Sequence, residues 1–385
     1  MQNLSLNDQF TTFCRKKMFS ITPSARLRPS PFYDSTLKEG VREFTTYNNM
    51  LMPTGYGDPE GEYWRLINGV SQWDVAVERQ VQLKGPDAGK LAQILAPRDL
   101  RNCKTGQGKY VPICNHDGIL LNDPILLKVD EQCYWLSIAD SNIWFWAKAV
   151  ASERRLDVEV SEPDVSPMAI QGPKSDDVVA SVFGDWVREL KYFWFRESTI
   201  EDIPGGGGPL RMVQTGRIRD LPAGRFPGKP TLGNLQGGRQ ALGHRPWNPN
   251  LTERIESGLL SWGGRDTDEK TNPFEVRMGK YMDLDLSDEV IGIEALQKIH
   301  AEGPRRHQLG LIMEEEEPMR PGFVWNDIIF EGNKIGDLTN NVWSRRLEQN
   351  IGFALVSTKS QPGDEVRVNL EGKSIKGKLV ELPFL

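Results

Sequence analysis

Apolar residues along this chain recur at two spacings, and each spacing predicts one kind of element. Apolar and polar side chains alternate over residues 81–83, as in a half-buried strand. A Gly-Pro-Asp turn follows at 85–87, and apolar residues then return at i, i+3, i+4 and i+7. We therefore predict a strand, a turn and a helix in succession, with the helix burying Ala88, Leu91, Ala92 and Leu95.

The same succession returns further along the chain. Residues 168–170 are apolar, a Gly-Pro-Lys turn occupies 172–174, and residues 178–183 again show helical spacing. A strand at 134–138 and a helix at 142–151 separate the two units. Two units of one plan suggest an internally duplicated α+β region, although Gly-Pro turns are common enough for the likeness to be a coincidence.

Beyond residue 307 the pattern changes to short strands separated by glycine turns. This pattern is typical of a small all-β barrel. We therefore predict an α+β fold with a leader at 1–30, a duplicated region at 31–290 and a β-barrel domain at 305–385. The predicted barrel strands are 309–313, 328–330, 352–357 and 365–370.

One carboxylate interrupts an apolar run that has the composition of a buried strand. An Asp-Gly turn leads into apolar residues 119–121, and after an Asn-Asp-Pro step the apolar residues resume at 125–127. A carboxylate inside such a run has to be hydrogen-bonded, paired with a cation or used in chemistry. Asp123 is therefore a candidate functional residue, the alternative being a cap for the turn before Pro124.

Composition excludes several classes of protein. The 385 residues leave room for two or three domains, and 38% hydrophobic with 26% charged residues is ordinary for a soluble protein. The net charge of −6 argues against a nucleic-acid surface. No apolar run approaches the roughly 18 residues of a membrane span, and residues 1–20 lack the apolar core of a signal peptide. We therefore expect a cytoplasmic protein without nucleic-acid or membrane partners.

Cysteine and histidine narrow the candidate chemistry further. The four residues of each type form neither a Cys-x-x-Cys pair nor metal-ligand spacing, so no zinc site or disulfide framework is predicted. A nucleophile elbow, a Walker A loop and a dinucleotide fingerprint are also missing from the sequence. The one excess is eleven tryptophans, whose flat faces suit a stacked heterocycle or a cation.

Residues 205–248 differ from everything around them. They open with four glycines, are dominated by Gly, Pro and Arg, and show neither strand nor helix periodicity. A structureless segment of this length is unusual inside a compact domain. Order is expected to return at 252–262, where Thr252 can cap a helix with Ile255 and Leu259 on its apolar face.

Nine segments carry a resemblance to a known family: Tyr47–Thr54, Trp73–Val75, Glu78–Val81, Pro97–Leu100, Trp135–Ser141, Glu162–Pro167, Gln171–Lys174, Thr252–Trp262 and Thr271–Val276. They resemble the glycine-cleavage T-protein superfamily of folate-dependent aminomethyl- and methyltransferases, and in particular its dimethylsulfoniopropionate demethylase branch. The likeness covers roughly residues 31–384, apart from 205–248. It implies a three-part α+β fold with a central folate pocket and a C-terminal barrel.

The resemblance assigns folate-binding roles to three residues. It implies that Asp123 faces N5 of tetrahydrofolate as the catalytic residue, and that Tyr110 and Arg254 also line the folate pocket. T proteins carry an Asp-Asp pair at this position, whereas this chain has Asn122 before Asp123. In that departure the chain resembles the demethylases.

The resemblance also implies a methyl-donor site at Ser137 and Trp186. A sulfonium methyl is already activated, because its leaving group is a neutral thioether, and displacement by N5 needs alignment more than acid–base help. Aromatic faces can hold a sulfonium as they hold quaternary ammonium, for roughly 0.5–2 kcal/mol per contact. The predicted function is methyl transfer from dimethylsulfoniopropionate, or a similar small methyl donor, to N5 of tetrahydrofolate, a co-substrate.

The family's pterin-binding glutamate lies in a Gly-Gly-Phe-Glu-Ile-Tyr-Leu-like segment that is missing here. The genetic code allows Arg211–Gly216 and Gly216–Pro222 to encode, one base on, Gly-Trp-Ser-Lys-Gln-Gly and Gly-Gly-Phe-Glu-Ile-Tyr-Leu. We therefore hypothesise a reading-frame shift within 205–248, in the gene or in its sequencing, with a genuine loop as the alternative. A shifted protein would lose three pocket residues, a Trp at Met212, a Glu at Arg219 and a Tyr at Leu221.

Three other functions remain open. An aminomethyltransferase of glycine cleavage would release ammonia and manage protons at N5, and both Asn122 and the tryptophan count speak against it. A folate-binding assembly factor would carry a Lys-Gly-Cys-Tyr-x-Gly-Gln signature, which is missing here. The folate half of a sarcosine- or dimethylglycine-oxidising enzyme would need a flavin-binding half. The expected partners are tetrahydrofolate and a small methyl donor, and a homodimer is one of the assembly states left open.

Overall fold

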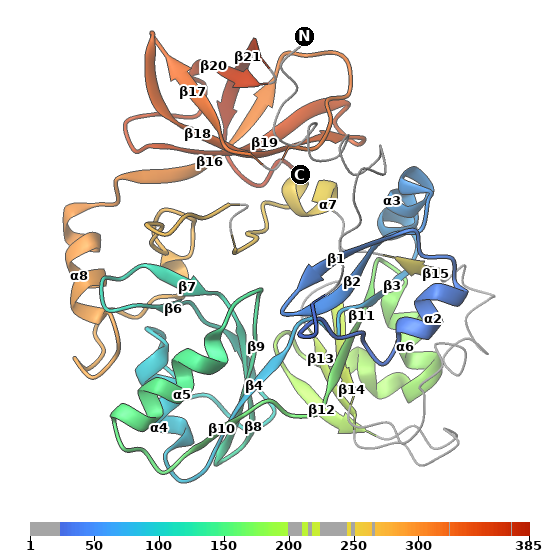
Figure 1. Cartoon of the computed structure of the whole chain (residues 1–385), viewed down its shortest axis with the longest axis vertical. Coiled ribbons are helices and arrows are strands. Elements are labelled where there is room, and N and C mark those ends of the chain that lie inside the picture. The colour runs from blue at the N-terminus through green and yellow to red at the C-terminus, as the bar shows by residue number, and fades with distance from the viewer. Residues whose placement is uncertain are drawn as a thin grey trace.

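The computed structural model describes residues 24–198, 210–214, 218–223, 245–247, 251–263, 266–322, 324–370 and 372–385, with three strands between 210 and 247 described by their backbone alone. Figure 1 shows a β-barrel above two lobes, each built from a sheet and helices. Among the described helices, none is both long enough and apolar enough to cross a membrane.

The first lobe is a five-stranded antiparallel sheet in the order β10-β4-β9-β8-β5. Helices α4 (Ala88–Leu95) and α5 (Ile143–Glu153) pack on it and bury a core that includes Leu91, Leu126 and Leu136. The predicted strand at 81–83 and helix at 88–95 are confirmed. The strands are β4 (Gln80–Lys84), β5 (Gly108–Tyr110), β8 (Ile125–Asp130), β9 (Cys133–Ser137) and β10 (Glu159–Ser161), and β6 (Ile113–Cys114) forms a small hairpin with β7 (Leu120–Asn122).

The second lobe is a six-stranded sheet with helices on both faces, in the order β12-β13-β14-β11-β3-β15. Met168 and Ile170 pack toward α6 (Ser175–Phe183), while Ala169 packs toward α3 (Pro59–Asn68), as strand alternation requires. Three of its strands lie in the stretch without periodicity. The strands are β3 (Ser71–Asp74), β11 (Ser166–Gln171), β12 (Phe195–Ser198), β13 (Leu210–Gln214), β14 (Ile218–Ala223) and β15 (Arg245–Trp247).

Two glycines support the duplication, because each makes the same turn in its own lobe. Gly85 and Gly172 have φ values of +142° and +116°, and each accepts a hydrogen bond from the residue three positions on. A Cβ at Gly85 would lie 2.6 Å from the Asp157 carbonyl oxygen, and one at Gly172 would lie 2.5 Å from the Gly69 carbonyl oxygen. Only glycine permits both the backbone angle and the close approach.

The C-terminal region is a closed six-stranded barrel in the order β16-β19-β18-β17-β20-β21, as predicted. Its core includes Leu311, Leu338 and Val356. The pattern missed β18 and β21, because glycine and polar residues interrupt both strands. The strands are β16 (Arg306–Met313), β17 (Asn326–Phe330), β18 (Asn333–Ser344), β19 (Gln349–Ser357), β20 (Glu365–Leu370) and β21 (Lys373–Val380).

The helix expected over 252–262 is shorter than predicted. Helix α7 covers Leu251–Glu256, and Gly258 then takes a positive φ of +67°. The Leu259 N–H donates back to the Arg254 carbonyl, so the chain turns away after little more than one helical turn. The other helical elements are α2 (Tyr33–Lys38), η1 (Asp185–Glu189), η4 (Gly279–Tyr281) and α8 (Ile293–Glu302).

The N-terminal hairpin of β1 (Glu43–Tyr47) and β2 (Met50–Gly55) packs on the core of the second lobe through Met50 and Met52, and its tip reaches the first lobe. At its tip, Asn48 has a φ of +46°, a left-handed conformation that asparagine tolerates. The Asn48 N–H donates to Asp140, and its side chain accepts a hydrogen bond from the Ser141 N–H. Arg28, which the sequence assigned to a leader, exchanges backbone hydrogen bonds with this hairpin.

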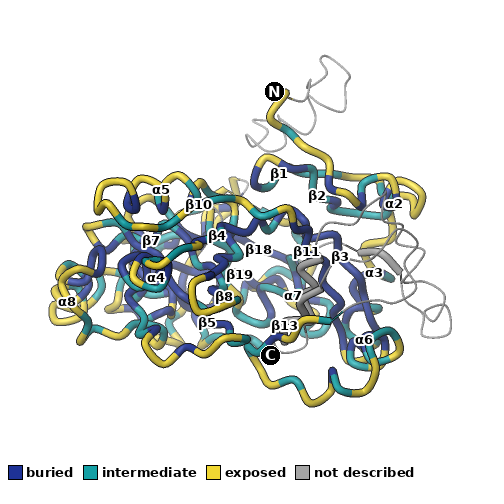
Figure 2. The backbone as a smooth tube through the Cα atoms, turned by 90° about the horizontal axis from the view of Figure 1, so that it is seen from below, coloured by how far each residue is buried: buried dark blue, intermediate teal, exposed yellow. Residues whose placement is uncertain are grey.

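A buried carboxylate on α7 joins the barrel to the second lobe. Glu256 is fully buried and accepts hydrogen bonds from Tyr63 of α3 at 2.8 Å and from Ser344 of β18 at 2.6 Å. The Arg346 guanidinium forms an ion pair with the same carboxylate. Figure 2 shows buried stretches of chain in the middle of the molecule.

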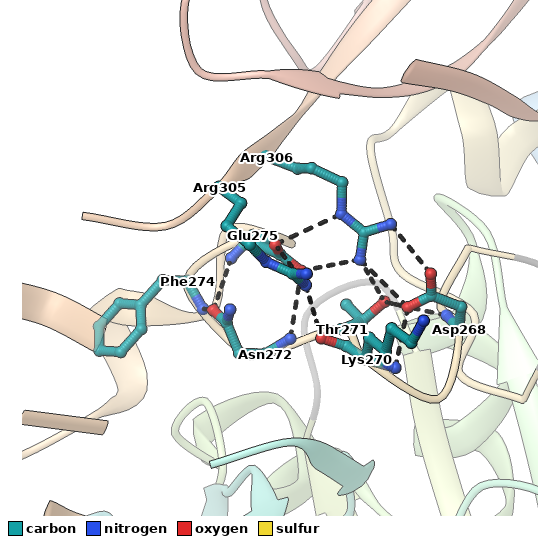
Figure 3. A network of polar contacts seen from close by, with 8 residues as sticks. All are labelled: Asp268, Lys270, Thr271, Asn272, Phe274, Glu275, Arg305 and Arg306. Carbon is teal, nitrogen blue, oxygen red and sulfur yellow. Dashed lines mark hydrogen bonds and ion pairs between the residues drawn. The ribbon is translucent and has the colours of Figure 1, made fainter. Parts of the chain in front are cut away.

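A second polar network ties the loop after α7 to the start of the barrel (Figure 3). Arg306 contacts Asp268 at 2.9 Å and the fully buried Glu275 at 2.9 Å. Burial opposes ionisation of Asp268, but hydrogen bonds from Arg306 and Thr271 outweigh it and hold the pKa of Asp268 well below its usual range. The network keeps residues 268–275 beside the first lobe, where the Thr271 carbonyl accepts a hydrogen bond from Leu120.

Candidate active site

Asp123 lies in the break between β7 and β8, where Pro124 interrupts the apolar run. Protein closely surrounds its side chain, yet part of the residue stays accessible to solvent, which suits a group that meets a ligand. The Tyr110 hydroxyl donates to the Asp123 carboxylate at 2.5 Å. Burial raises the pKa of Asp123 to about 7, against the Tyr110 hydrogen bond, which lowers it, and with a smaller rise from the charge of Asp266.

Tyr110 ends β5, directly across from Ile125 of β8, so the sheet register brings it beside Asp123. Its ring meets Tyr281 edge to face, with centroids 4.9 Å apart, and the Arg98 guanidinium lies 5.3 Å from the Tyr281 centroid. Burial, together with the neighbouring Asp123, raises the pKa of Tyr110 well above its usual value. Tyr110 therefore stays protonated and remains a hydrogen-bond donor to the carboxylate.

Arg254 reaches the site from α7 through Asp266. Its Nη1 donates to Asp266 at 2.5 Å and to the Leu259 carbonyl at 2.8 Å. Asp266 is fully buried, accepts further hydrogen bonds from Asn340 and the Ser261 N–H, and is close enough to raise the pKa of Asp123. Nε and Nη2 of Arg254 are buried without an acceptor among the described residues. Those two donors can hold a carbonyl or carboxylate ligand.

The Asn122 side chain is not hydrogen-bonded to Asp123 or Tyr110, and both of its polar atoms make structural hydrogen bonds. Its Nδ2 donates to the Ala139 carbonyl at 3.2 Å and to the Ser141 hydroxyl at 2.7 Å, and its Oδ1 accepts from the Ala139 N–H at 3.1 Å. An aspartate could accept from Ala139 and Ser141 but could not donate to the carbonyl. The Asn122 amide therefore connects β7 by hydrogen bonds to the segment that leads into α5.

Ser137 lies on the five-stranded sheet, near the start of β8, which follows Asp123. It ends β9, is partly exposed, and faces Ile125 across the strand, two residues from Asp123. Its hydroxyl accepts a hydrogen bond from Gln80 at 2.8 Å. Strand alternation directs Ser137 and Ile125 away from the α4–α5 core, toward the interior between the two lobes.

Trp186 lies in the second lobe, on η1, and its contacts are largely structural. Its indole N–H donates to the Phe183 carbonyl at 2.6 Å, and the Arg196 guanidinium lies 4.8 Å from its ring centroid. It packs on an apolar cluster that also reaches Tyr47. Among the described residues, no hydrogen bond or ring contact joins Trp186 to Ser137 or Asp123, so the substrate role expected of it stays a prediction.

The sequence missed Tyr47, which the structure brings to the site. This residue precedes the hairpin tip and is close enough to Glu78, Asp123 and Asp140 for burial and their charges to raise its pKa strongly. Asp266 and Tyr281 were also missed. The only sequence signal for Tyr47 was its place at the start of the Tyr47–Thr54 segment. The neighbouring residues give no indication that Tyr47 lies near Asp123, which is far along the chain.

Met212, Arg219 and Leu221 fall on β13 and β14, whose side chains lie outside the described structure. The backbone of β14 pairs with β11, and β13 pairs with β12. Most of 205–248 lies outside the described residues, so the reading-frame hypothesis stays a prediction. Among the described residues there is also no group of His, Cys, Asp and Glu that could hold a metal ion.

Two family models match this chain, one for each half of the architecture. The GCVT N-terminal domain matches residues 32–206, and the glycine cleavage T-protein C-terminal barrel domain matches residues 306–385. A crystal structure of the glycine cleavage system aminomethyltransferase T from Bartonella henselae has the same fold, with a TM-score of 0.81 and 20% identity, over 93% of this chain and 98% of that one.

Curated proteins of full length are similar as well. The dimethylsulfoniopropionate demethylase DmdA of Ruegeria pomeroyi is 35% identical over 339 residues, which is 88% of this chain and 92% of that protein. The aminomethyltransferase of Symbiobacterium thermophilum is 26% identical over 377 residues, 93% of this chain and 97% of that protein. Fold and relatives together define a folate-dependent one-carbon transferase. The chain belongs to the glycine-cleavage T-protein family.

Proposed function

We propose that this chain moves a methyl group from dimethylsulfoniopropionate, or a similar small sulfonium donor, to N5 of tetrahydrofolate. The observation that carries the proposal is the Tyr110–Asp123 pair, linked through Asp266 to the unpartnered donors of Arg254. It occurs in a chain 35% identical to a dimethylsulfoniopropionate demethylase over nearly its whole length. The similarity supports the donor, and the polar set supports the folate.

The residues fit tetrahydrofolate by their donor and acceptor chemistry. Two buried nitrogens of Arg254, Nε and Nη2, have no acceptor among the described residues, which suits a carboxylate or a carbonyl of the ligand. Asp123 is an acceptor with a single protein partner among the described side chains, which suits an N–H of the pterin. When bound, tetrahydrofolate supplies N5, an amine whose lone pair takes the methyl group while the sulfur keeps the electrons of the broken bond and leaves as a thioether.

Asp123 is proposed to orient and deprotonate the amine. Its carboxylate accepts the N–H hydrogen bond and then holds the proton that the methylated nitrogen releases. A pKa near the working pH is the best compromise for such a group, and burial raises that of Asp123 to about 7. Tyr110 favours the ionised form, because its hydroxyl donates to the carboxylate at 2.5 Å and this hydrogen bond lowers the pKa of Asp123.

Ser137 and Trp186 are proposed for the methyl donor. Ser137 has a hydroxyl that can donate to an anionic group on the methyl donor, since its oxygen accepts from Gln80 and its hydrogen points elsewhere. Trp186 already carries the Arg196 guanidinium over its ring, 4.8 Å from the centroid. A sulfonium therefore has to use the other face of the indole or displace Arg196, because two cations on one face repel each other.

The aminomethyltransferase alternative has a weaker footing. Its support comes from relatives such as the Symbiobacterium thermophilum protein, at 26% identity. Both polar atoms of Asn122 are committed to Ala139 and Ser141. A second carboxylate at this position would have to break one of these contacts, so residue 122 does not supply an extra proton carrier.

The reading-frame shift within 205–248 is part of the proposal. The family match ends at residue 206, and the barrel match begins only at 306. This gap contains most of the segment where the shift is placed, and it extends beyond it to Thr252–Trp262 and Thr271–Val276, which resemble the family. Replacing a pocket glutamate by Arg219 would remove hydrogen bonds worth about 1.5–3 kcal/mol each, so folate binding would fall by about tenfold to a hundredfold.

The test is an assay of 5-methyltetrahydrofolate formation with two proteins, the chain as written and a version with Met212–Pro222 restored to the alternative frame. We expect product from dimethylsulfoniopropionate with the restored protein, and tetrahydrofolate binding about tenfold to a hundredfold weaker in the chain as written. Formation of 5,10-methylenetetrahydrofolate and ammonia from an aminomethylated carrier protein, without product from the sulfonium, would replace the methyltransferase by the aminomethyltransferase. Equal folate binding by the two proteins, or DNA that cannot encode the alternative peptide, would remove the frame hypothesis.

A further inference from the structure

Two glutamines on β4, Gln80 and Gln82, differ in how much of their side-chain amide is hydrogen-bonded. Strand alternation directs both to the same side of the sheet, with Gln80 opposite Ser137 and Gln82 opposite Trp135. Gln82 uses both ends of its amide, because Oε1 accepts from the Trp135 indole at 3.0 Å and Nε2 donates to Ser161 at 3.2 Å. Gln80 is 2% exposed and uses only its nitrogen.

The neighbours of Gln80 fix which way round its amide lies. One neighbour is the Glu78 backbone carbonyl, 2.9 Å away, which can only accept. The amide nitrogen must therefore face it, and the second N–H of the same nitrogen donates to the Ser137 hydroxyl at 2.8 Å. Turning the amide over would put two acceptors against each other at Glu78.

This arrangement settles the direction of the Ser137 hydroxyl. A hydroxyl oxygen that accepts from Gln80 turns its own hydrogen elsewhere. No described residue accepts that hydrogen, and Ser137 is partly exposed on the face that Asp123 also borders. Gln80 thereby presents Ser137 as a free donor.

Gln80 also leaves its own Oε1 buried without a donor among the described residues. A buried, unpaired amide oxygen costs free energy that an apolar side chain of similar size would avoid. The side chain of Gln82, two residues away on the same face, shows that the strand can satisfy a whole amide. The role of Gln80 therefore rests on its amide nitrogen, which orients the Ser137 hydroxyl.

We infer that Gln80 is a positioning residue that holds the Ser137 hydroxyl as a hydrogen-bond donor toward the carboxylate of the methyl donor. The inference rests on the proposed function and names the part of the donor that the site recognises. Gln80 itself does not touch the donor. A small sulfonium with a carboxylate is then preferred over one without, because only the first gives the oriented hydrogen an acceptor.

The test is a double-mutant cycle on dimethylsulfoniopropionate binding, measured by calorimetry with Q80M, S137A and the double variant in the frame-restored protein. We expect S137A to weaken binding about tenfold or more, since it removes a hydrogen bond to a charged group. We expect Q80M to weaken it about threefold or more, since a released hydroxyl spreads over three staggered positions. The double variant should bind no more weakly than S137A, because Gln80 acts only through Ser137.

Two controls separate positioning from general damage. Q82M removes an amide-to-serine hydrogen bond from the same strand and should leave donor binding unchanged. Q80E keeps the size of the side chain but can only accept, so it should turn the Ser137 hydrogen toward residue 80 and weaken binding more than Q80M does. Transfer from trimethylsulfonium, which has no carboxylate, should keep its kcat/KM in Q80M.

Three results would overturn the inference while leaving the proposed function standing. The first is unchanged binding of dimethylsulfoniopropionate in Q80M and Q80E. The second is a loss of binding from Q80M that is as large on the S137A background as in the protein with Ser137. The third is a loss of kcat/KM in Q80M that is as large for trimethylsulfonium as for dimethylsulfoniopropionate. A frame-restored protein that neither binds dimethylsulfoniopropionate nor forms 5-methyltetrahydrofolate would overturn the proposed function and, with it, this inference.

Discussion

Asp123 and Glu256 are both carboxylates enclosed by protein, and the chain surrounds them in opposite ways. Glu256 accepts from two hydroxyls, on Tyr63 and Ser344, and pairs with Arg346. Asp123 has one hydroxyl partner, and burial raises its pKa to about 7. A saturated carboxylate holds two parts of a fold together, whereas an undersupplied one keeps the capacity to take a proton or a ligand.

The largest expected effect is on activity when Asp123 is replaced. D123N cannot hold the proton from the amine, so methyl transfer should fall by about 10²- to 10⁴-fold. Its stability should be unchanged or higher, because a group that burial makes costly to ionise is now neutral. The measurement is kcat beside thermal unfolding, with D74N as control: Asp74 is another buried acid, with a pKa raised by burial to about 6, outside the site. Full activity in D123N would remove Asp123 from catalysis.

Replacing Glu256 should do the reverse. E256Q leaves the Arg346 cation without its partner carboxylate, so the free energy of unfolding should fall by about 3–5 kcal/mol, while kcat per folded molecule stays near normal. Chemical denaturation measures the loss. The matched control is E153Q, which breaks an exposed pair with Arg154 and should cost under about 1 kcal/mol. If E256Q abolishes turnover in fully folded protein, the junction takes part in the reaction and the contrast with Asp123 fails.

The smallest expected effect comes from a variant that shifts the pKa of Asp123 and leaves the carboxylate in place. Y110F deletes the hydrogen bond that lowers the pKa of Asp123, so that pKa should rise above about 7. Because the proposed reaction needs the carboxylate, activity should rise with pH through this pKa, and in Y110F the rise should move to higher pH. A shift of one unit costs about tenfold at any pH below both values. A pH–rate profile that does not move would mean that another group controls it.

Much of the scaffold could be predicted from local pattern. The strand and helix of 80–95, the second unit at 166–183 and the barrel all follow periodicity that a few neighbouring residues set. The failures occur where tertiary contacts override the pattern. Helix α7 ends at Glu256 rather than continuing to 262, because Gly258 takes a left-handed turn and Arg254 is drawn to Asp266.

The site was predictable only where one residue stood out from its surroundings. Asp123 is a carboxylate in an apolar run, and the family resemblance supplied Tyr110, Arg254 and Ser137. The structure brings Tyr110 to Asp123 through the β5–β8 register, and it bonds Arg254 to Asp266, whose charge acts on Asp123. Gln80 and Tyr47 gave no such signal, because what matters about each is a contact with a residue distant along the chain.

The junction around Glu256 also has a consequence for the order of folding. Its hydrogen bonds join Tyr63 to residues 193 and 283 positions further along the chain. Closing loops of this length has the largest entropic cost. Such contacts therefore form after local structure has shortened the flexible chain between them. The lobes and the barrel should therefore form first and dock last. By the same reasoning this seam is where the native protein first opens, and amide hydrogens along α7 should exchange through that partial opening well before those of the barrel core.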